Sequence, residues 1–140
     1  MYLLDTNGVS ELRKAHTGKV DPQVLHWARG VVPAQLYLSV ISVLELEMGI
    51  LRIERRDTHQ GRHLRTWLEH QVLPAFQERI LMVDIAVARP CAHLHIPDPR
   101  AERDALIAAT ALTHDLTLVT RNIADFPTSG LRLLNPWDAP

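Results

Sequence analysis

The stretch MYLLDTN, residues 1–7, decides the fold class because a short apolar run ends abruptly on polar residues. The three residues after Met1 form an unbroken apolar segment, which is typical of a strand buried in the centre of a parallel sheet. In such sheets ligands bind just beyond the carboxyl ends of the strands, which is where Asp5 stands. An aspartate before further polar residues is equally suited to cap a helix. Both roles for Asp5 stay open at this point.

The same pattern recurs in LTLVTRNIADF, residues 116–126. LTLVT is the clearest strand pattern in the chain, and polar residues follow it at once: Arg121, Asn122 and then Asp125. The sequence therefore predicts two sets of polar side chains at the carboxyl edge of one sheet. Asp125 is alternatively no more than a turn or cap residue.

Short apolar runs alternate with helical patterns along the chain, which predicts an α/β domain whose mainly parallel sheet has about four to five strands. The predicted strands cover residues 2–4, 36–39, 79–84, 116–120 and 131–134. The predicted helices cover residues 9–13, 21–27, 42–54 (capped by Ser42 or Ser39), a long segment stopping near Pro74, residues 85–94, and a helix introduced by Asp98-Pro99. The 140 residues contain no repeat or linker, so one domain over 1–140 is expected.

The overall composition excludes several classes of protein. The formal net charge of −1 argues against general electrostatic adhesion to nucleic acid, although a local basic patch remains compatible with it. The single cysteine, Cys91, excludes an internal disulfide framework and a cysteine zinc site. No apolar run approaches the roughly 20 residues that a membrane span needs. A cytoplasmic protein without a membrane anchor is the simplest interpretation.

Glu45 is the first carboxylate that falls at an unusual place. At helical spacing it lies within an apolar stripe of the segment SVISVLELEMGIL, formed by Ile41, Leu44, Met48 and Leu51. A carboxylate on a buried face is costly unless it has a partner or a metal. The alternative is a rotated helix that leaves Glu45 exposed, and Glu47 is interpreted as a surface charge.

Asp104 presents the same anomaly in the alanine-rich segment ERDALIAATALTH. If Asp98 caps this helix, Asp104 lies in the second turn, on a face shared with Ile107, Ala108 and Ala111. Small residues there would let the helix lie close to the sheet, so Asp104 would point towards the strand ends. The alternative is an ion pair with Arg100 or Arg103.

The unusual positions of Asp5, Glu45 and Asp104 are explained if the three carboxylates together bind one or two hard divalent cations. Mg²⁺ prefers oxygen ligands, keeps several waters and is typically held by carboxylates together with substrate phosphate. Such an ion activates a water and neutralises charge during in-line displacement at phosphorus. Without a metal, clustered acids would repel one another and raise their own pKa values. The sequence thus predicts an acidic pocket for phosphodiester hydrolysis.

Four stretches together resemble the PIN-domain ribonucleases of the VapC or FitB (StbB-like) type, the toxin half of a toxin–antitoxin pair. They are LLDTNGVSEL, LSVISVLELEMGI, RDALIAATALTHDLTLVTRNIADF and LRLLNPW. The resemblance covers nearly the whole chain. It implies a three-layer α/β/α fold, cleavage of RNA that depends on Mg²⁺ or Mn²⁺, and a homodimer.

The resemblance also assigns roles to individual residues. The acidic metal ligands of the family fall on Asp5, Glu45 and Asp104. A fourth acid is common after the Thr-Arg pair, but Asn122 stands there, and Asp125 is a secondary candidate. The residues implied to support these ligands or to contact phosphate are Thr6, Asn7, Thr120 and Arg121.

The resemblance further implies a small VapB- or FitA-type antitoxin whose C-terminal segment wraps the toxin and places an arginine among the acids. Operator DNA would be bound through that antitoxin, since we identify no DNA-binding motif in this chain.

Two rival functions are weighed against a ribonuclease. An aspartyl-phosphate phosphatase is disfavoured because Asn7 replaces the second aspartate of its motif and no lysine follows Lys19. A PIN module that binds without cutting is favoured only by Asn122. The arginine-rich segment 52–65 and the histidines are interpreted as surface or packing residues, and the three tryptophans as core or interface anchors.

Overall fold

A computed structural model describes residues 1–126 and 130–138 of the chain. At its centre lies a sheet of five strands in the order β3-β2-β1-β4-β5, and every neighbouring pair is parallel. The bounds of the strands are β1 Tyr2–Leu4, β2 Leu36–Ser39, β3 Ile80–Leu81, β4 Thr117–Val119 and β5 Leu133–Leu134. The predicted parallel sheet is confirmed. The strands β3, β4 and β5 are each shorter than the predicted segments, because only part of each apolar run pairs with a neighbouring strand.

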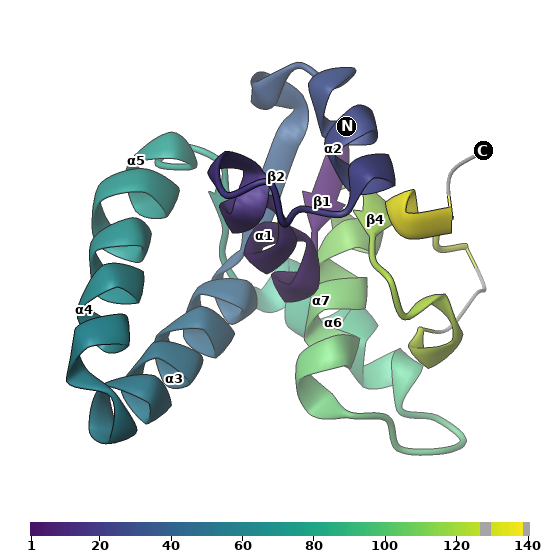
Figure 1. The fold of residues 1–140 in the computed structure, drawn as a ribbon. Helices are drawn as coiled ribbons and strands as arrows, with labels where there is room; N and C mark the ends of the chain where they lie inside the picture. Colours follow the sequence, from purple (N-terminus) through teal and green to yellow (C-terminus); the bar gives the residue numbers. More distant parts are fainter. Residues whose placement is uncertain (127–129, 139–140) are drawn as a thin grey trace.

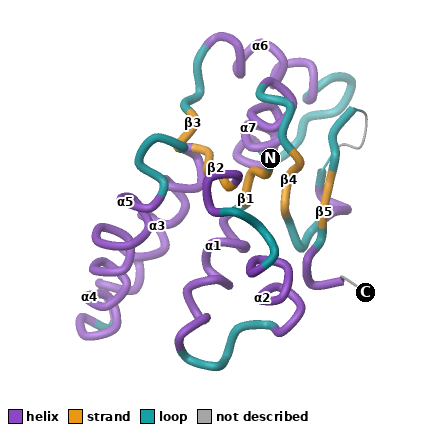
Figure 2. The backbone as a smooth tube through the Cα atoms, turned by 90° about the horizontal axis from the view of Figure 1, so that it is seen from above, coloured by secondary structure: helices purple, strands orange, loops and turns teal. Residues whose placement is uncertain are grey.

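Helices cover both faces of this sheet (Figures 1 and 2). Because side chains alternate along a strand, Leu4 of β1 packs into a core with α1, α3 and α4, whereas Leu3 packs into a second core with α7. The predicted three-layer α/β/α arrangement is therefore confirmed. The bounds of the helices are α1 Thr6–Leu12, α2 Pro22–Arg29, α3 Val40–Arg56, α4 Thr58–Trp67, α5 Leu73–Ala75, α6 Ile85–Leu94 and α7 Glu102–Thr113.

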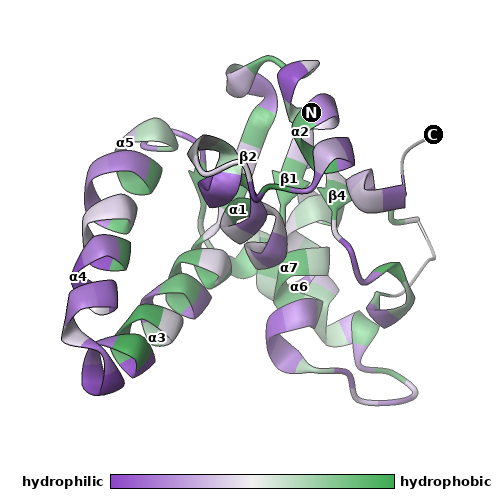
Figure 3. Cartoon of the chain, in the orientation of Figure 1, coloured by the Kyte–Doolittle hydropathy of each residue, from purple (hydrophilic) through white to green (hydrophobic). Residues whose placement is uncertain are grey.

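Helices α3 and α4 form an antiparallel hairpin that projects from the body (Figure 1). Arg65 of α4 joins the two helices, since it donates to Glu54 at 2.9 Å and also pairs with Glu47. Gly61 allows the close approach, because a Cβ atom there would lie 2.6 Å from Glu54 Cγ. Glu47 is thus an ion-pair partner rather than the plain surface charge predicted. Much of α4 is hydrophilic, whereas β1 and β2 are mostly hydrophobic (Figure 3).

The segment after α4 continues into a five-residue π-helix at Leu68–Val72 and then into α5. The helical path therefore passes Pro74 and ends at Ala75, one residue later than the predicted stop. Within the described residues, no helix combines the length and the apolar character that a membrane crossing requires.

The predicted buried face of α3 is wrong. Leu44 and Leu51 are 46% and 52% exposed, and the residues that face the core are Ser42, Leu46 and Ile50. Helix α3 carries two apolar stripes, and periodicity alone does not say which of them packs against the sheet. Of the two caps considered, Ser39 is the one used: its side chain accepts from the amide of Ile41 at 3.0 Å.

The predicted start of α7 is also wrong. Its N-cap is Ala101 rather than Asp98, so Asp104 lies in the first helical turn. Helix α7 packs against α6, where Pro90 has no N–H for the carbonyl of Ala86. The Thr113 hydroxyl of α7 donates to that carbonyl at 3.0 Å and so satisfies it. This contact helps to fix α7, and with it Asp104, relative to the sheet.

Candidate active site at the carboxyl edge of the sheet

A pocket of about 160 Å³ opens beyond the carboxyl ends of β1 and β4, between the N-terminal parts of α3 and α7. The amide of Asp5 donates to the carbonyl of Val119 at 3.0 Å, so the two central strands stay paired up to this pocket. The structure brings together all five predicted catalytic residues. The lining residues are Asp5, Thr6, Asn7, Glu45, Asp104, Ile107, Asn122, Asp125 and Phe126.

Asp5 fulfils both of the roles that its sequence position left open. Its carboxylate caps α1 by accepting from the amide of Gly8 at 2.9 Å, and it also lines the pocket. The side chain is only 6% exposed. This burial raises the pKa of Asp5, and the charges of Glu45 and Asp104 add to the rise. Hydrogen bonds from Thr120 and Gly8 act in the opposite direction.

Glu45 reaches the pocket from the side of α3. The Thr6 hydroxyl donates to Glu45 Oε1 at 2.6 Å, and Arg103 Nε lies 3.7 Å from Oε2. The helix is rotated, as the alternative supposed, but Glu45 is not exposed, since only 24% of its side chain is accessible. The positive charge of Arg103 therefore lies beside the acids of the pocket.

Asp104 faces Glu45 from the first turn of α7. Burial raises its pKa first, the charges of Glu45 and Asp125 raise it further, and Arg103 lowers it. Among the described residues its carboxylate forms neither a hydrogen bond nor the predicted alternative ion pair with Arg100 or Arg103. A carboxylate that has no hydrogen bond or ion pair and lies beside other acids would be stabilised by a bound cation.

The segment after β4 completes the site. The buried Thr120 hydroxyl accepts from the amide of Asn122 at 3.1 Å, which sets the turn into Ile123–Asp125. Asn122 and Asp125 both line the pocket. Arg121 does not; it lines a neighbouring hollow that shares Asn7 and Asn122 with the acidic pocket. Of the four predicted supporting residues, Thr6 and Thr120 therefore contact the acids directly.

The chemistry of this pocket fits a hard divalent cation. All the polar groups that we propose as ligands are carboxylate or amide oxygens, and the pocket has room for several waters of about 30 Å³ each. In the described part of the chain no three Asp, Glu, His or Cys side chains are already placed around a common metal position. Glu45 is held by Thr6 and Arg103, and Asp5 by its capping bond. A cation in this pocket would compete with these contacts for the carboxylate oxygens.

Removing Arg103 should favour the binding of a cation in this pocket. Arg103→Ala frees Glu45 from its ion pair and deletes a positive charge beside the pocket. Since exposed ion pairs contribute about 0.2–1 kcal/mol, the Mg²⁺ concentration that half-saturates the pocket in a calorimetric titration should fall about 1.4- to fivefold. Arg100→Ala, which removes a nearby exposed arginine without touching the acids, is the control. An unchanged or higher Mg²⁺ requirement in Arg103→Ala would contradict this account of Glu45.

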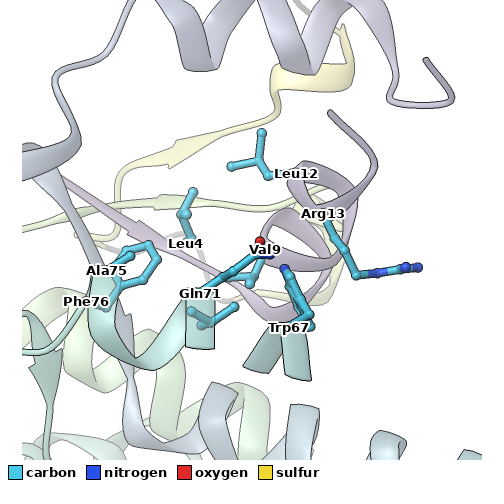
Figure 4. A pocket seen from close by; sticks show the side chains of 9 residues that line it. Leu4, Val9, Leu12, Arg13, Trp67, Gln71, Ala75 and Phe76 are labelled. Atoms are coloured by element: carbon cyan, nitrogen blue, oxygen red, sulfur yellow. The ribbon is translucent and has the colours of Figure 1, made fainter. Parts of the chain in front are cut away.

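A second pocket lies on the other side of α1 and has a different character (Figure 4). Apolar side chains of β1 and α1 face Trp67, Ala75 and Phe76 across it, and Arg13 lies over the Trp67 ring at 5.8 Å. No carboxylate lines this pocket. It offers room for an apolar side chain rather than for a metal or a phosphate.

A three-layer α/β/α domain with an acidic pocket at the carboxyl edge of a parallel sheet is the class that this fold and site define. Within that class, the family model described as "PIN domain" matches residues 2–126, and the chain belongs to this family.

Three similar proteins extend this result. The chain is 37% identical to VapC ribonuclease Y4jK of Sinorhizobium fredii, over 99% of each chain. The crystal structure of FitAcB from Neisseria gonorrhoeae superposes with a TM-score of 0.88 at 33% identity, covering 99% of this chain and 100% of that one. A toxin–antitoxin complex from Klebsiella pneumoniae matches with a TM-score of 0.65 at 26% identity, covering 97% and 98%.

Proposed function

We propose that this chain is a metal-dependent endoribonuclease that acts as the toxin of a VapBC-type toxin–antitoxin pair. The observation that carries the proposal is the convergence of Asp5, Glu45 and Asp104 in one pocket, although they are distant in sequence. The similarity to a VapC ribonuclease supports the reaction class. The similarity to a toxin–antitoxin complex supports the biological role.

In this proposal Asp5, Glu45 and Asp104 hold Mg²⁺ or Mn²⁺, and they are supported by the groups around them. Thr6 orients Glu45, and Thr120 orients Asp5. Asn122 offers a neutral carbonyl oxygen, and Asp125 supplies negative charge at the rim. When bound, the metal supplies an activated water and neutralises charge on the phosphate that is attacked. The products of hydrolysing single-stranded or loop RNA in this way carry 5′-phosphates.

A second candidate function is a PIN module that binds RNA or a protein without cleavage. One observation favours it: Asn122 stands in the pocket where an acid is common. The intact set of Asp5, Glu45 and Asp104 favours the nuclease instead.

The proposed partners are an antitoxin and a second copy of this chain. The acidic pocket suits an antitoxin arginine, and the apolar pocket on the other side of α1 suits an apolar residue of the same segment. For the homodimer we propose the surface that includes Met82, before α6, and Ile85, its first residue, which are 63% and 75% exposed. Operator DNA would be contacted through the antitoxin. Sedimentation of the chain alone and with antitoxin measures both assemblies.

The test of the function is cleavage of a mixed single-stranded RNA pool by antitoxin-free protein. We expect products with Mg²⁺ or Mn²⁺ and none with EDTA, and cleavage should return when excess metal is added back. Circular dichroism in EDTA verifies that the metal-free protein is still folded. Folded protein that cuts no RNA with either metal would contradict the nuclease and favour the binding module.

A further inference from the structure

Beside the acidic pocket lies a larger polar hollow of about 460 Å³, within the roughly 300–1,000 Å³ typical of small-molecule sites. The two share a wall made of Asn7 and Asn122. Its other lining residues come from α1, from the 3-10 turn Arg13–His16 that follows it, and from the chain after β4 and β5. They are Ser10, Glu11, Arg13, Lys14, Arg121 and Trp137.

The charge of this hollow is opposite to that of the acidic pocket. Three cations, Arg13, Lys14 and Arg121, line it together with one acid, so its net charge is positive. Arg13 lies over Trp67. The acid of the hollow, Glu11, is already engaged: one oxygen lies 3.3 Å from Lys14 Nζ, and the other accepts from the amide of Asp21 at 2.9 Å. A polyanion repelled by the acidic pocket would find compensating charge directly beside it.

Hydrogen bonds of Asn135 fix the position of Trp137 in this hollow. Asn135 Oδ1 accepts from the amide of Trp137 at 2.9 Å, and Asn135 Nδ2 donates to the carbonyl of Arg121 at 3.3 Å. The Arg121 guanidinium lies over the indole at 5.6 Å. Trp27 and Trp67 pack against the core beside α1, as predicted for core anchors, but the half-buried Trp137 belongs to none of the core clusters among the described residues.

We propose that this hollow is a nucleotide subsite, which binds one unpaired nucleotide of the RNA next to the bond that is cut. The base stacks on Trp137, and Arg121 and Lys14 pair with its flanking phosphates. A planar aromatic ring beside cations is the arrangement by which proteins bind single-stranded RNA without reading a helix. The inference rests on the proposed function, because it makes RNA the substrate of the adjoining pocket, and it assigns Trp137 a role other than an anchor.

The test separates binding from cleavage. Asp104→Asn protein in EDTA is titrated with short fluorescein-labelled homopolymers of adenylate, uridylate or cytidylate, and Kd is read from fluorescence anisotropy. Adding Trp137→Leu should weaken binding roughly 10-fold, as expected for the loss of one stacked base, whereas Trp137→Phe should largely preserve it. Arg121→Gln and Lys14→Gln should each weaken binding and reduce its salt dependence by about one charge.

Two matched controls are charged residues that do not line the hollow. Arg132→Gln removes an exposed arginine at the amino-terminal end of β5. Lys19→Gln removes the other lysine of the chain. Both should bind RNA as the parent Asp104→Asn does. Thermal unfolding verifies that every variant is folded; if Trp137→Leu is not, Arg121→Gln and Lys14→Gln carry the test.

The outcomes distinguish this inference from the proposed function. If the unmodified protein cuts RNA with metal but the three hollow variants bind RNA normally, the subsite is wrong and the nuclease stands. If the unmodified protein cuts nothing yet Trp137 and Arg121 are needed for binding, the subsite stands and the nuclease is wrong. No RNA binding by Asp104→Asn, or variants that weaken binding of an antitoxin but not of RNA, would overturn the subsite.

Discussion

Replacing Asp104 with asparagine should slow metal-dependent RNA cleavage by roughly 100-fold or more, because a lost carboxylate ligand removes several kcal/mol of stabilisation from the transition state. The same change should raise the thermal stability of the metal-free protein. Asp104 has a raised pKa because burial and the charges of Glu45 and Asp125 disfavour its ionised form. A neutral amide of the same shape relieves that cost, and no hydrogen bond of Asp104 is lost.

The two effects are measured side by side, as initial cleavage rates with Mg²⁺ and as Tm in EDTA. Asp115→Asn is a matched control, because this aspartate is exposed at the other edge of the sheet and pairs with Arg132. Its φ of 55° also suits asparagine. The control should cleave RNA normally. Cleavage by Asp104→Asn at the parent rate would remove this residue from the site, and a lower Tm would contradict the account of its charge.

The raised pKa values of Asp5 and Asp104 also predict how stability varies with pH. Above the usual aspartate value of 3.8 and up to the raised values, the folded protein binds more protons than the unfolded chain. The free energy of unfolding that these two groups contribute therefore falls as the pH rises through this range. Bound Mg²⁺ should reverse the trend, because the metal stabilises the ionised carboxylates. Tm measured against pH, with and without metal, gives the comparison.

Gly61→Ala should destabilise the protein by about 1–3 kcal/mol, although alanine is the better helix former. The new Cβ would lie 2.6 Å from Glu54 Cγ and 2.7 Å from Glu54 Cα. The second contact involves backbone, so no rotation of a side chain relieves it. Helices α3 and α4 must separate, which also disturbs the ion pair of Arg65 with Glu54.

Gly49→Ala provides the opposite case within α3. Apart from its chain neighbours and the backbone of α3 itself, no heavy atom lies within 4 Å of the Cβ that this substitution would add. Helix propensity therefore dominates, and stability should rise by up to about 1 kcal/mol. Urea unfolding of both variants gives the two free energies with opposite signs. If Gly61→Ala proved as stable as the parent protein, close packing of the hairpin would not depend on this glycine.

The sequence predicts the central elements of this fold better than its edges. The bounds of β1, β2 and α6 match, because an unbroken apolar run or a clear cap determines each of them locally. The shorter β3 and β5 depend on pairing with a neighbour, which the local pattern does not contain. The predicted start of α7 is wrong because Asp98-Pro99 is a good local capping signal, whereas the helix begins only after Ala101.

The candidate site shows the same division between local and tertiary information. Asp5, Asn122 and Asp125 all line the pocket, because polar residues that follow parallel strands reach one edge of the sheet. Glu45 is also placed in the pocket, although the face predicted to be buried around it is wrong. Two features have no local signal: Arg103 pairs with Glu45 across two helices, and Trp137 is brought beside Arg121 by Asn135.

The order of the strands in the sheet has a consequence for folding during translation. Strand β1 leaves the ribosome first, but it lies between β2 and β4, and β4 is made only when Thr117–Val119 are added. Asp5 then gains Val119 as a backbone partner and Thr120 beside its carboxylate. A nascent chain that stalls before this point lacks the edge on which the pocket is built. The proposed active site therefore cannot form on the ribosome before the segment through Thr120 has been synthesised.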